Sequence, residues 1–355
     1  MIEVIKTAKY DIQLSASFVI LEQVLAQFKN SKLFVLVDEN TSKHCLPLVS
    51  SFFKNDFHTI EIDAGEENKN LKTCETIWEQ LKIGGAKRSD LLLNLGGGVI
   101  GDMGGFCAST YKRGINFIQM PTTLLSMVDA SIGGKLGINF SGLKNNVGLF
   151  NNPNAVLIFP EFLKTLPHNQ IKSGFAEMLK HSLIANKNHW ENLKNIYPKV
   201  DTIIINDIKN SILIKKEIVE QDFKESGLRK LLNYGHTVGH ALESWSLKNE
   251  ENSLLHGEAI AIGMIIENYF ASKTLEFSIE EMEQVNKVIL NVFDKRNIEN
   301  YNIYELLVLM KQDKKNLDNQ ISFSLLQNIG EAKFDKHIET QLIKEGINYY
   351  KNLKQ

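Results

Sequence analysis

Hydrophobic residues follow two different patterns along the chain, and the change between them falls near residue 160. Upstream of it, short apolar runs end in turn residues, as buried parallel strands do. The segments predicted to be strands are 33–37, 57–62, 90–95, 116–120 and 155–159. Helical spacing lies between them, for example over 70–81. This alternation predicts an open α/β sheet of the Rossmann-like kind.

Downstream of the change, apolar positions recur with the period of an α-helix. The segments with this spacing are 171–185, 203–219, 228–245 and 255–273, and a short strand is predicted at 321–326. Three of the six prolines, Pro153, Pro160 and Pro167, surround the change. We therefore predict two domains, an α/β domain over 1–160 and a mostly α-helical domain over 161–355.

Composition narrows the class of protein. The 355 residues are too many for one ordinary core. A formal net charge of −2 argues against a nucleic-acid partner, and no apolar run is long enough for a membrane span. The three cysteines fit no metal-binding spacing, and no signal peptide precedes them. We expect a cytoplasmic protein with reduced thiols.

A glycine-rich turn follows the strand predicted at 90–95 and opens a helix. It reads Gly96-Gly97-Gly98-Val99-Ile100-Gly101-Asp102 and contains G-x-G-x-x-G. Such a turn lets backbone N–H groups approach a pyrophosphate at a helix N-terminus. The acid usually found about 20 residues later is missing, and the acids Asp38 and Glu66 lie upstream instead. A dinucleotide site and a tight turn without a ligand both remain open here.

The second half contains candidate metal ligands. Glu177 and His256 lie on predicted helices, and His236 and His240 lie one helical turn apart. One glutamate and two histidines with an open fourth position suit a catalytic zinc. Spacing alone would allow His236 and His240 both to bind, with Glu243 a turn further on. A single histidine is usually structural, but this grouping beside small residues favours a metal site.

Basic residues in glycine-rich or apolar surroundings form a third group. Its members are Lys135, Lys144, Lys180, Lys215, Arg229 and Lys314. A lone lysine is normally a solvated surface charge. If these side chains converge, they form a pocket for a substrate with more than one negative group.

Taken together, these segments resemble the 3-dehydroquinate synthases of the sugar-phosphate cyclase superfamily. The matching segments run in order: GGGVIGD at 96–102, YKRG at 111–114, PTTLLSMVDASIGGK at 121–135, KNNVGLF at 144–150, GFAEMLK at 174–180, GLRKLLNYGHTVGH at 227–240, HGE at 256–258 and DKK at 313–315. The resemblance implies an NAD-binding domain followed by a helical metal domain.

The resemblance also implies a reaction in the shikimate pathway of aromatic amino acid biosynthesis. In that reaction, 3-deoxy-D-arabino-heptulosonate 7-phosphate becomes 3-dehydroquinate and phosphate. Oxidation by NAD, β-elimination of phosphate, reduction, ring opening and an aldol closure follow one another, so NAD is regenerated in each turnover. The motifs contain no dedicated carboxylate base, which leaves the departing phosphate as the candidate base.

Transferred residue by residue, the resemblance implies that Glu177, His236 and His256 hold a divalent metal, zinc or cobalt. His240 would then handle a proton beside the metal, which differs from the expectation based on spacing. Arg113, in YKRG, would reach the active site of the neighbouring subunit in a homodimer.

The remaining expected site residues contact nucleotide or substrate. The nucleotide set is Asp38, Glu66, Lys69, Gly97, Gly98, Val99, Ile100, Gly101, Asp102, Thr122, Thr123, Asp129, Lys135, Lys144, Phe162, Leu163, Lys164 and Thr165. The substrate set is Lys135, Asn145, Lys180, Lys215, Arg229, Asn233, His240 and the pair Lys314 and Lys315. The implied substrate is a small anionic sugar-acid phosphate.

Three alternatives stay open. A metal-dependent polyol dehydrogenase of the glycerol dehydrogenase type would release NADH, but it has no use for Lys135, Lys180, Lys215 and Arg229 together. Another cyclase, such as 2-deoxy-scyllo-inosose synthase, acts on a substrate without a carboxylate, so Lys215 and Arg229 argue against it. A binding protein without turnover would not need metal ligands and substrate cations together.

Overall fold

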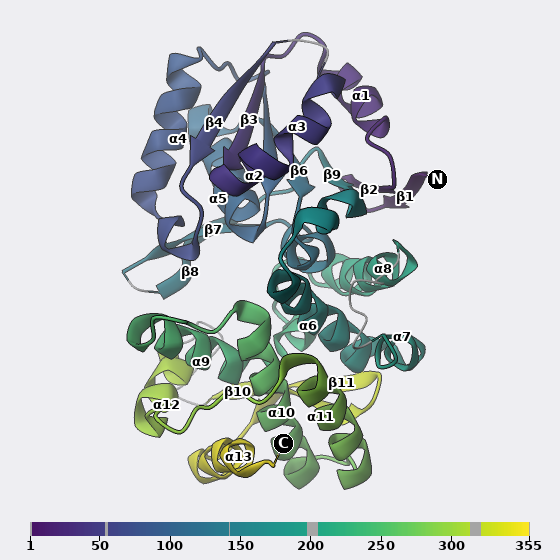
Figure 1. Ribbon diagram of the computed structural model, residues 1–355, viewed down its shortest axis with the longest axis vertical. Coiled ribbons are helices and arrows are strands. Elements are labelled where there is room, and N and C mark those ends of the chain that lie inside the picture. The colour runs from purple at the N-terminus through teal and green to yellow at the C-terminus, as the bar shows by residue number, and fades with distance from the viewer. Residues whose placement is uncertain (1, 54–55, 142, 197–204, 313–320, 355) are drawn as a thin grey trace. The chain divides into compact units, whose positions relative to one another are not determined.

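The computed structural model describes residues 2–53, 56–141, 143–196, 205–312 and 321–354. They form two compact units, Met1–Pro167 and His168–Gln355 (Figure 1). The division lies a few residues after the expected boundary at 160, because the short helical turn Pro160–Thr165 belongs to the first unit.

A seven-stranded sheet forms the centre of the first unit, in the order β1-β2-β9-β6-β5-β3-β4. Its strands are β1 Ile2–Lys6, β2 Asp11–Ser15, β3 Leu33–Asp38, β4 Phe57–Ile62, β5 Leu91–Gly96, β6 Asn116–Pro121 and β9 Ala155–Ile158. All five predicted strands are confirmed, and they pair in parallel. Strand β5 is buried along its whole length, as expected of a parallel strand covered on both faces.

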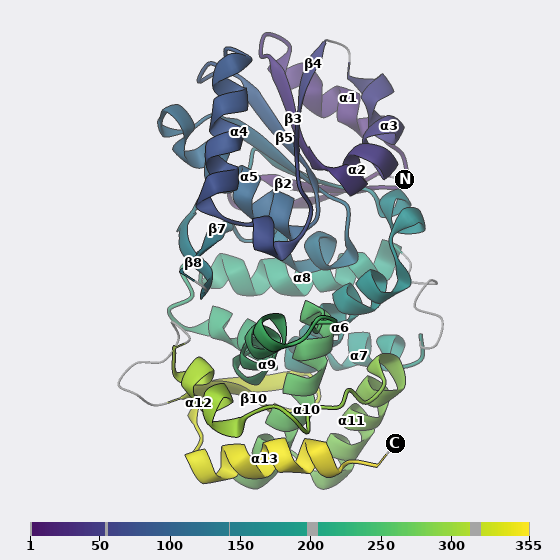
Figure 2. The ribbon, with the colours of Figure 1, turned by 60° about the vertical axis from the view of Figure 1, so that its left-hand side comes forward.

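Helices pack against this sheet (Figure 2). They are α1 Ile20–Leu25, α2 Glu39–His44, α3 Leu46–Val49, α4 Leu71–Ile83 and α5 Gly98–Thr110. Helix α4 confirms the prediction at 70–81 and begins where the Asn70 side chain accepts a hydrogen bond from the backbone N–H of Thr73. Its Ile77 and Leu81 pack with Met103 of α5 in one apolar core. A separate hairpin, β7 Lys135–Phe140 and β8 Leu143–Phe150, was not predicted.

The second unit is mainly helical. Its elements are α6 His168–Ala185, α7 Lys187–Leu193, α8 Ile205–Gln221, α9 His236–Asn249, α10 His256–Thr274, α11 Ile279–Phe293, α12 Ile303–Gln312 and α13 Thr340–Asn352, with a hairpin of β10 Ser322–Asn328 and β11 Glu331–His337. Helix α10 packs against α6, α9, α11 and α13, so it is apolar and buried on nearly all sides. Helices α6, α8 and α10 and strand β10 confirm the predictions.

The prediction of one helix over 228–245 is wrong. A 3₁₀ turn, Leu228–Asn233, comes first, and α9 starts only at His236. Gly235 separates them with a φ of +79°, and a Cβ there would lie 2.6 Å from Met264 Cγ. The left-handed backbone and the close approach both require glycine at this position.

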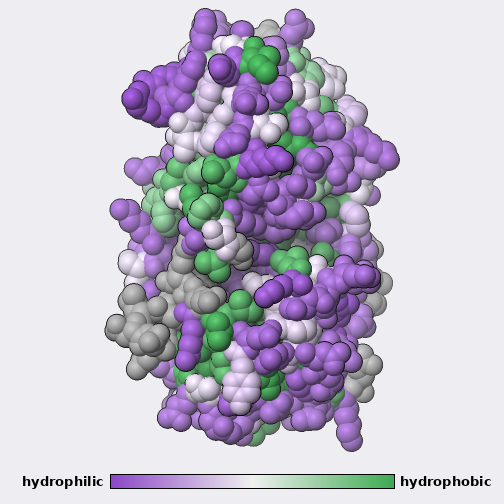
Figure 3. Space-filling view, turned by 90° about the vertical axis from the view of Figure 1, so that its left-hand side faces the viewer, coloured by the Kyte–Doolittle hydropathy of each residue, from purple (hydrophilic) through white to green (hydrophobic). Residues whose placement is uncertain are grey.

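The face of the molecule in Figure 3 is mostly hydrophilic, with apolar side chains in small separate groups. In the part of the chain that the structure describes, every helix is too short or too polar to cross a bilayer.

Candidate functional site

In the first unit, the expected nucleotide residues follow the carboxyl ends of parallel strands. Asp38 ends β3, the turn Glu66–Asn68 follows β4, the glycine-rich turn follows β5, Thr122 and Thr123 follow β6, and the turn Pro160–Thr165 follows β9. These ends are in register, since Asp38 pairs with Ile62 and Gly96 with Pro121. In open α/β sheets, this edge is where ligands bind.

The glycine-rich turn opens helix α5 and borders a small hollow. Gly97 is the residue before the helix, and a Cβ there would lie 3.1 Å from Thr123 Cγ2. The hollow is lined by Gly96, Gly97, Gly98, Gly101, Asp102, Gln119, Pro121, Ser126, Ala130 and Ser131. Because Gly97, Gly98 and Gly101 have no side chains, the backbone N–H groups of the first turn of α5 are open to an anion.

A buried lysine connects this turn to the β7–β8 hairpin. Lys69 Nζ lies 2.6 Å from Asp102 Oδ2 and 2.6 Å from Asn145 Oδ1. Asn139, which the sequence analysis did not select, donates from Nδ2 to Glu66 Oε1 (2.9 Å) and accepts from the backbone N–H of Asn145 (2.8 Å). Expected nucleotide residues and the expected substrate residue Asn145 therefore share one hydrogen-bond network.

The other expected residues of the first unit lie around these elements. Lys135 begins β7, Lys144 lies in β8 and Asp129 lies in a π-helical turn, Ser126–Ala130. Phe162 is buried, and its ring lies 5.3 Å from that of Phe18, so it packs the turn Pro160–Thr165 against the fold.

In the second unit, the three expected metal ligands come together. Glu177 lies in α6, and His236 and His256 are the first residues of α9 and α10. Glu177 Oε1 lies 3.4 Å from His236 Nε2 and 3.3 Å from His256 Nε2. One donor atom of each residue lies within 4.8 Å of the others. The carboxylate of Glu177 is 1% exposed, so this charge is almost fully removed from water.

Two close contacts produce this arrangement. A Cβ on Gly257 would lie 2.3 Å from Ser173 O, and the N–H of Gly257 donates to Ser173 Oγ (2.9 Å), so α10 starts directly against α6. Ser173 and Glu177 are one turn apart, which turns Glu177 toward His256. Glu267, buried in α10, accepts from the N–H of Gly235 (2.7 Å) and fixes the start of α9 at His236.

The second ring nitrogen of each histidine faces an oxygen atom. His236 Nδ1 donates to Tyr234 O (3.0 Å) and His256 Nδ1 to Glu243 Oε2 (3.3 Å). Both Nε2 atoms therefore face Glu177, which is how metal-binding histidines are usually oriented. A glutamate and two histidines suit a catalytic divalent metal with an open position, so the residues fit such an ion.

Electrostatics supports this donor set. Burial and the nearby Lys180 ammonium lower the pKa of His236 to about 3, so its ring is neutral at pH 7. Burial alone would raise the pKa of Glu177, but Lys180 and His236 hold it well below its usual value. Burial would lower the pKa of His256, yet the carboxylates of Glu243 and Glu177 raise it to about 9. A metal at this site would therefore displace a proton from His256.

His240 lies next to the donor set. Its ring centroid is 5.1 Å from that of His236 and 5.9 Å from that of His256. A ligand atom of His240 lies within 4.8 Å of ligand atoms of Glu243 and His256, and His236 is not part of this group. His240 is therefore placed beside the three expected ligands, where the resemblance expects a proton-handling residue.

Buried polar residues surround the donor set in the same unit. Lys180 is ion-paired with Glu177, three residues away on α6, and is 1% exposed. Arg229, Lys215 and Asn233 are also buried, at 1%, 6% and 8% exposure. Three buried cations in one unit form a concentration of positive charge, which suits a site for an anionic ligand.

Glu225 is a site residue that the sequence analysis missed. It adopts a left-handed φ of 62°, and its Oε1 accepts a hydrogen bond from Asn233 Nδ2 at 2.7 Å. Its charge also raises the pKa of Lys180, against the larger lowering by burial. The sequence analysis found no carboxylate base, but the fold supplies a carboxylate here. An acid four residues before Arg229, in a turn with glycine, was the available signal.

The remaining expectations concern exposed residues and residues outside the described ranges. Arg113 ends the turn Tyr111–Arg113 in the first unit and is exposed. Lys164 is also largely exposed and pairs with Glu161 at 2.6 Å. Lys314 and Lys315 lie outside the described residues.

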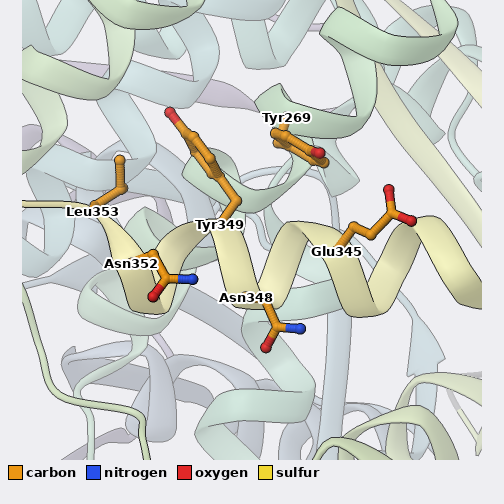
Figure 4. A pocket seen from close by; sticks show the side chains of 6 residues that line it. All are labelled: Tyr269, Glu345, Asn348, Tyr349, Asn352 and Leu353. Carbon is orange, nitrogen blue, oxygen red and sulfur yellow. The ribbon is translucent and has the colours of Figure 1, made fainter.

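A surface hollow of about 430 Å³ lies elsewhere in the second unit (Figure 4). It is lined by Tyr269, Glu345, Asn348, Tyr349, Asn352 and Leu353. Tyr269 is thirteen residues after His256 on α10, about 20 Å along the helix axis. The hollow has one carboxylate and no cation, so it lacks the features of the candidate site.

Comparison with known proteins identifies the family of this chain. Residues 59–173 match the family model of the 3-dehydroquinate synthase N-terminal domain, and residues 174–316 match that of the C-terminal domain. The chain belongs to the 3-dehydroquinate synthase family. A 3-dehydroquinate synthase from Parabacteroides distasonis is 41% identical over 338 residues, which cover 93% of this chain and 94% of the relative.

Solved structures share the fold. The chain aligns with 2-epi-5-epi-valiolone synthase from Streptomyces hygroscopicus subsp. jinggangensis, solved with NAD⁺ and Zn²⁺, at a TM-score of 0.86 and 24% identity over 99% of both chains. It aligns with 2-deoxy-scyllo-inosose synthase, solved with carbaglucose-6-phosphate, NAD⁺ and Co²⁺, at 0.86 and 23% identity, covering 98% of this chain and 99% of the other. This member of the 3-dehydroquinate synthase family therefore shares its fold with these two synthases.

Proposed function

We propose that this chain is a 3-dehydroquinate synthase, which converts 3-deoxy-D-arabino-heptulosonate 7-phosphate into 3-dehydroquinate and phosphate with NAD and a divalent metal, zinc or cobalt. The observation that carries the proposal is the donor set of Glu177, His236 and His256, which lies in one unit with buried Lys180 and Arg229. A polyol dehydrogenase needs the donor set but not the cations.

In this proposal, the first unit binds NAD at the carboxyl edge of its sheet. The N–H groups at the start of α5 would hold the pyrophosphate, and the acids Asp38 and Glu66 would face the ribose hydroxyls. Lys69 would keep Asp102 and Asn145 in place through its two hydrogen bonds. When bound, NAD would supply reversible hydride transfer at the carbon atom that bears a substrate hydroxyl group.

Glu177, His236 and His256 would hold the metal. When bound, such an ion polarises a substrate oxygen and lowers the pKa of a bound hydroxyl group. Tyr234 O and Glu243 keep the two imidazole rings in one orientation, so little rearrangement is needed on metal binding. His240, beside both rings, would accept or return a proton on the substrate.

The buried cations would recognise the two anionic groups of the substrate. The planar guanidinium of Arg229 suits a carboxylate, and Lys180 and Lys215 add point charges for phosphate or carboxylate oxygens. Glu225, oriented by Asn233, is our candidate for taking up a proton during elimination, alongside the departing phosphate.

We further propose that the enzyme is a cytoplasmic homodimer. Its three cysteines are free and buried, which fits a reducing compartment. Arg113 has the exposed position that a residue shared between subunits requires.

The decisive assay measures phosphate release at a sub-stoichiometric concentration of NAD. With zinc or cobalt and the heptulosonate phosphate, each NAD should support the release of many phosphates without net NADH. A hexose 6-phosphate, which lacks the carboxylate, should release none. NADH that accumulates in proportion to an oxidised polyol would favour the dehydrogenase instead, and phosphate release from the hexose phosphate alone would favour another cyclase.

A further inference from the structure

A carboxylate at the end of helix α8 organises the loop that follows it. Asp222, the residue after Gln221, accepts four hydrogen bonds from this loop. Its Oδ1 accepts from the backbone N–H (3.0 Å) and the hydroxyl (3.1 Å) of Ser226. Its Oδ2 accepts from the N–H groups of Gly227 (2.7 Å) and Arg229 (3.0 Å). The loop between residues 222 and 229 is therefore closed around one side chain.

The location of this acid is unfavourable for the helix itself. The C-terminal end of a helix carries partial negative charge, so an ionised acid there is repelled. Partial burial would also raise the pKa of Asp222, but the N–H groups of Gly227, Ser226 and Arg229 lower it to about 2. The N–H groups of the loop therefore stabilise the charge of Asp222, and the helix does not. This indicates that Asp222 serves to fix the loop.

The closed loop places three residues of the candidate site. Glu225 lies inside it with a left-handed φ of 62°, which costs energy for a residue other than glycine. Arg229 follows it and returns a hydrogen bond from Nη1 to Phe223 O at 2.6 Å. Asn233, one turn further, donates to Glu225 Oε1 at 2.7 Å. The closure by Asp222 therefore fixes the backbone on the C-terminal side of Glu225, at Ser226 and Gly227.

We propose that Asp222 is a positioning residue that sets the carboxylate of Glu225 and the guanidinium of Arg229 for the substrate without touching the substrate itself. The proposal rests on the proposed synthase function, because it assigns Asp222 a role in that site. It goes beyond the expected site residues, none of which is Asp222.

Three substitutions separate this role from a general effect on folding. Asp222→Ala removes all four acceptor contacts, and we expect kcat/KM to fall about 100-fold, the scale seen when reacting groups are slightly misplaced. Asp222→Asn keeps one acceptor oxygen, so its kcat/KM should lie between that of Asp222→Ala and that of the unchanged enzyme. The matched control is Lys224→Ala, an exposed residue of the same loop, which should retain full activity. Metal content should stay unchanged in all three, and the thermal midpoint should stay unchanged in Lys224→Ala.

A double-mutant cycle tests whether Asp222 acts through Glu225. In a Glu225→Gln background, the additional Asp222→Ala substitution should cost clearly less than 100-fold, because one of the two groups it positions is already lost. If Asp222→Ala lowers kcat/KM by the same factor in both backgrounds, Asp222 does not act through Glu225 and the proposal is overturned.

Hydrogen exchange gives a measurement that does not depend on the reaction. The backbone amides of Ser226, Gly227 and Arg229 should be protected in the unchanged protein and in Lys224→Ala, and should lose protection in Asp222→Ala. Unchanged protection in Asp222→Ala would overturn the proposal. If the unchanged protein releases no phosphate from the heptulosonate phosphate, the proposed function fails, and the exchange result still decides whether Asp222 holds the loop.

Discussion

The two histidines of the donor set differ in protonation state, and the sequence does not show this difference. His236 and His256 are each the first residue of a helix, where the helix dipole disfavours a positive imidazolium. For His236 the helix dipole and burial both disfavour the charged ring, so the ring stays neutral at pH 7. For His256 the two carboxylates of Glu243 and Glu177 outweigh both effects. The same residue type therefore enters the site in two protonation states, which only the three-dimensional neighbours determine.

The first prediction concerns the division of roles between ligands and neighbours. Glu177→Ala, His236→Ala and His256→Ala should each abolish tight metal binding, because three protein ligands leave no redundancy. His240→Ala should keep the metal and lose about 100-fold in rate, the range of a single acid–base group. Metal content and phosphate release of each purified variant measure both effects. His337→Ala, at an exposed histidine of the same unit, is the control. A His240→Ala protein without metal, alongside a His256→Ala protein that retains it, would contradict this division.

At the scale of elements, the local sequence pattern predicted the buried strands and the long helices, but it did not predict the break in the helical pattern at Gly235. Strands β3, β5 and β6 are apolar runs that end in turn residues, so their positions could be read from the chain. The break at Gly235 could not, because it depends on Glu267, 32 residues away, which accepts the Gly235 N–H. The apolar residues Leu231 and Leu232 continue the helical pattern through the 3₁₀ turn, which explains the incorrect single helix.

The same limit applies to the candidate site. Glu177, His236 and His256 could be selected by residue type and by resemblance, since metals take a small set of ligands. Glu225 acts through a left-handed backbone and Asn139 through its place in a hairpin, and neither property is visible in the residue type. Glu267 is a fully buried acid in an apolar helix, so its role depends on a partner in another helix.

The contact between α7 and α8 leads to a prediction about pH. His189 Nε2 lies 3.0 Å from Ser211 Oγ in a buried position, and burial together with His181 lowers the pKa of His189 to about 4. Its unfolded value is about 6.5. Between these values the unfolded chain binds a proton that the folded unit does not, so stability falls as pH decreases from 6.5 towards 4. At pH 5 this one group should cost about 2 kcal/mol relative to pH 7.5.

Thermal unfolding of the His189→Gln variant measures this cost. The substitution removes the titrating group and retains a side chain that can bond to Ser211. On lowering the pH from 7.5 to 5, the midpoint of the unchanged protein should therefore fall several degrees more than that of the variant. His337→Gln should show no such difference, because His337 is exposed. Equal falls for His189→Gln and the unchanged protein would show that His189 does not titrate in this way.

At the scale of the whole molecule, the proposed chemistry is divided between the two units. The edge of the parallel sheet in one unit has the features of a nucleotide site, and the helical unit carries the metal donor set and the buried cations. Sequence similarity to the family extends across both units, from residue 59 to residue 316. The proposed reaction requires hydride transfer and metal-assisted chemistry on one substrate, so neither unit alone would be active.

We propose that Arg113 extends this division to a second copy of the chain. Lys112 and Arg113 both have left-handed backbones, with φ of 51° and 65°. Lys112 is anchored, since its Nζ donates to Ala86 O at 2.6 Å and its carbonyl accepts from Arg88 Nε at 2.8 Å. The exposed Arg113 makes no hydrogen bond or ion pair with any described residue. The strained turn thus presents the Arg113 side chain at the surface of the first unit.

The last prediction is that Arg113 serves the active site of the partner in a homodimer, where its planar fork binds an anionic group of the substrate. Arg113→Ala should weaken substrate use and leave metal content and folding intact. Mixing it with inactive Lys180→Ala then tests where it acts. In a mixed dimer, one site carries both defects and the other carries neither, so about half of the activity per mixed dimer should return. If subunit exchange is demonstrated and the mixture stays inactive, Arg113 acts in its own site or in none.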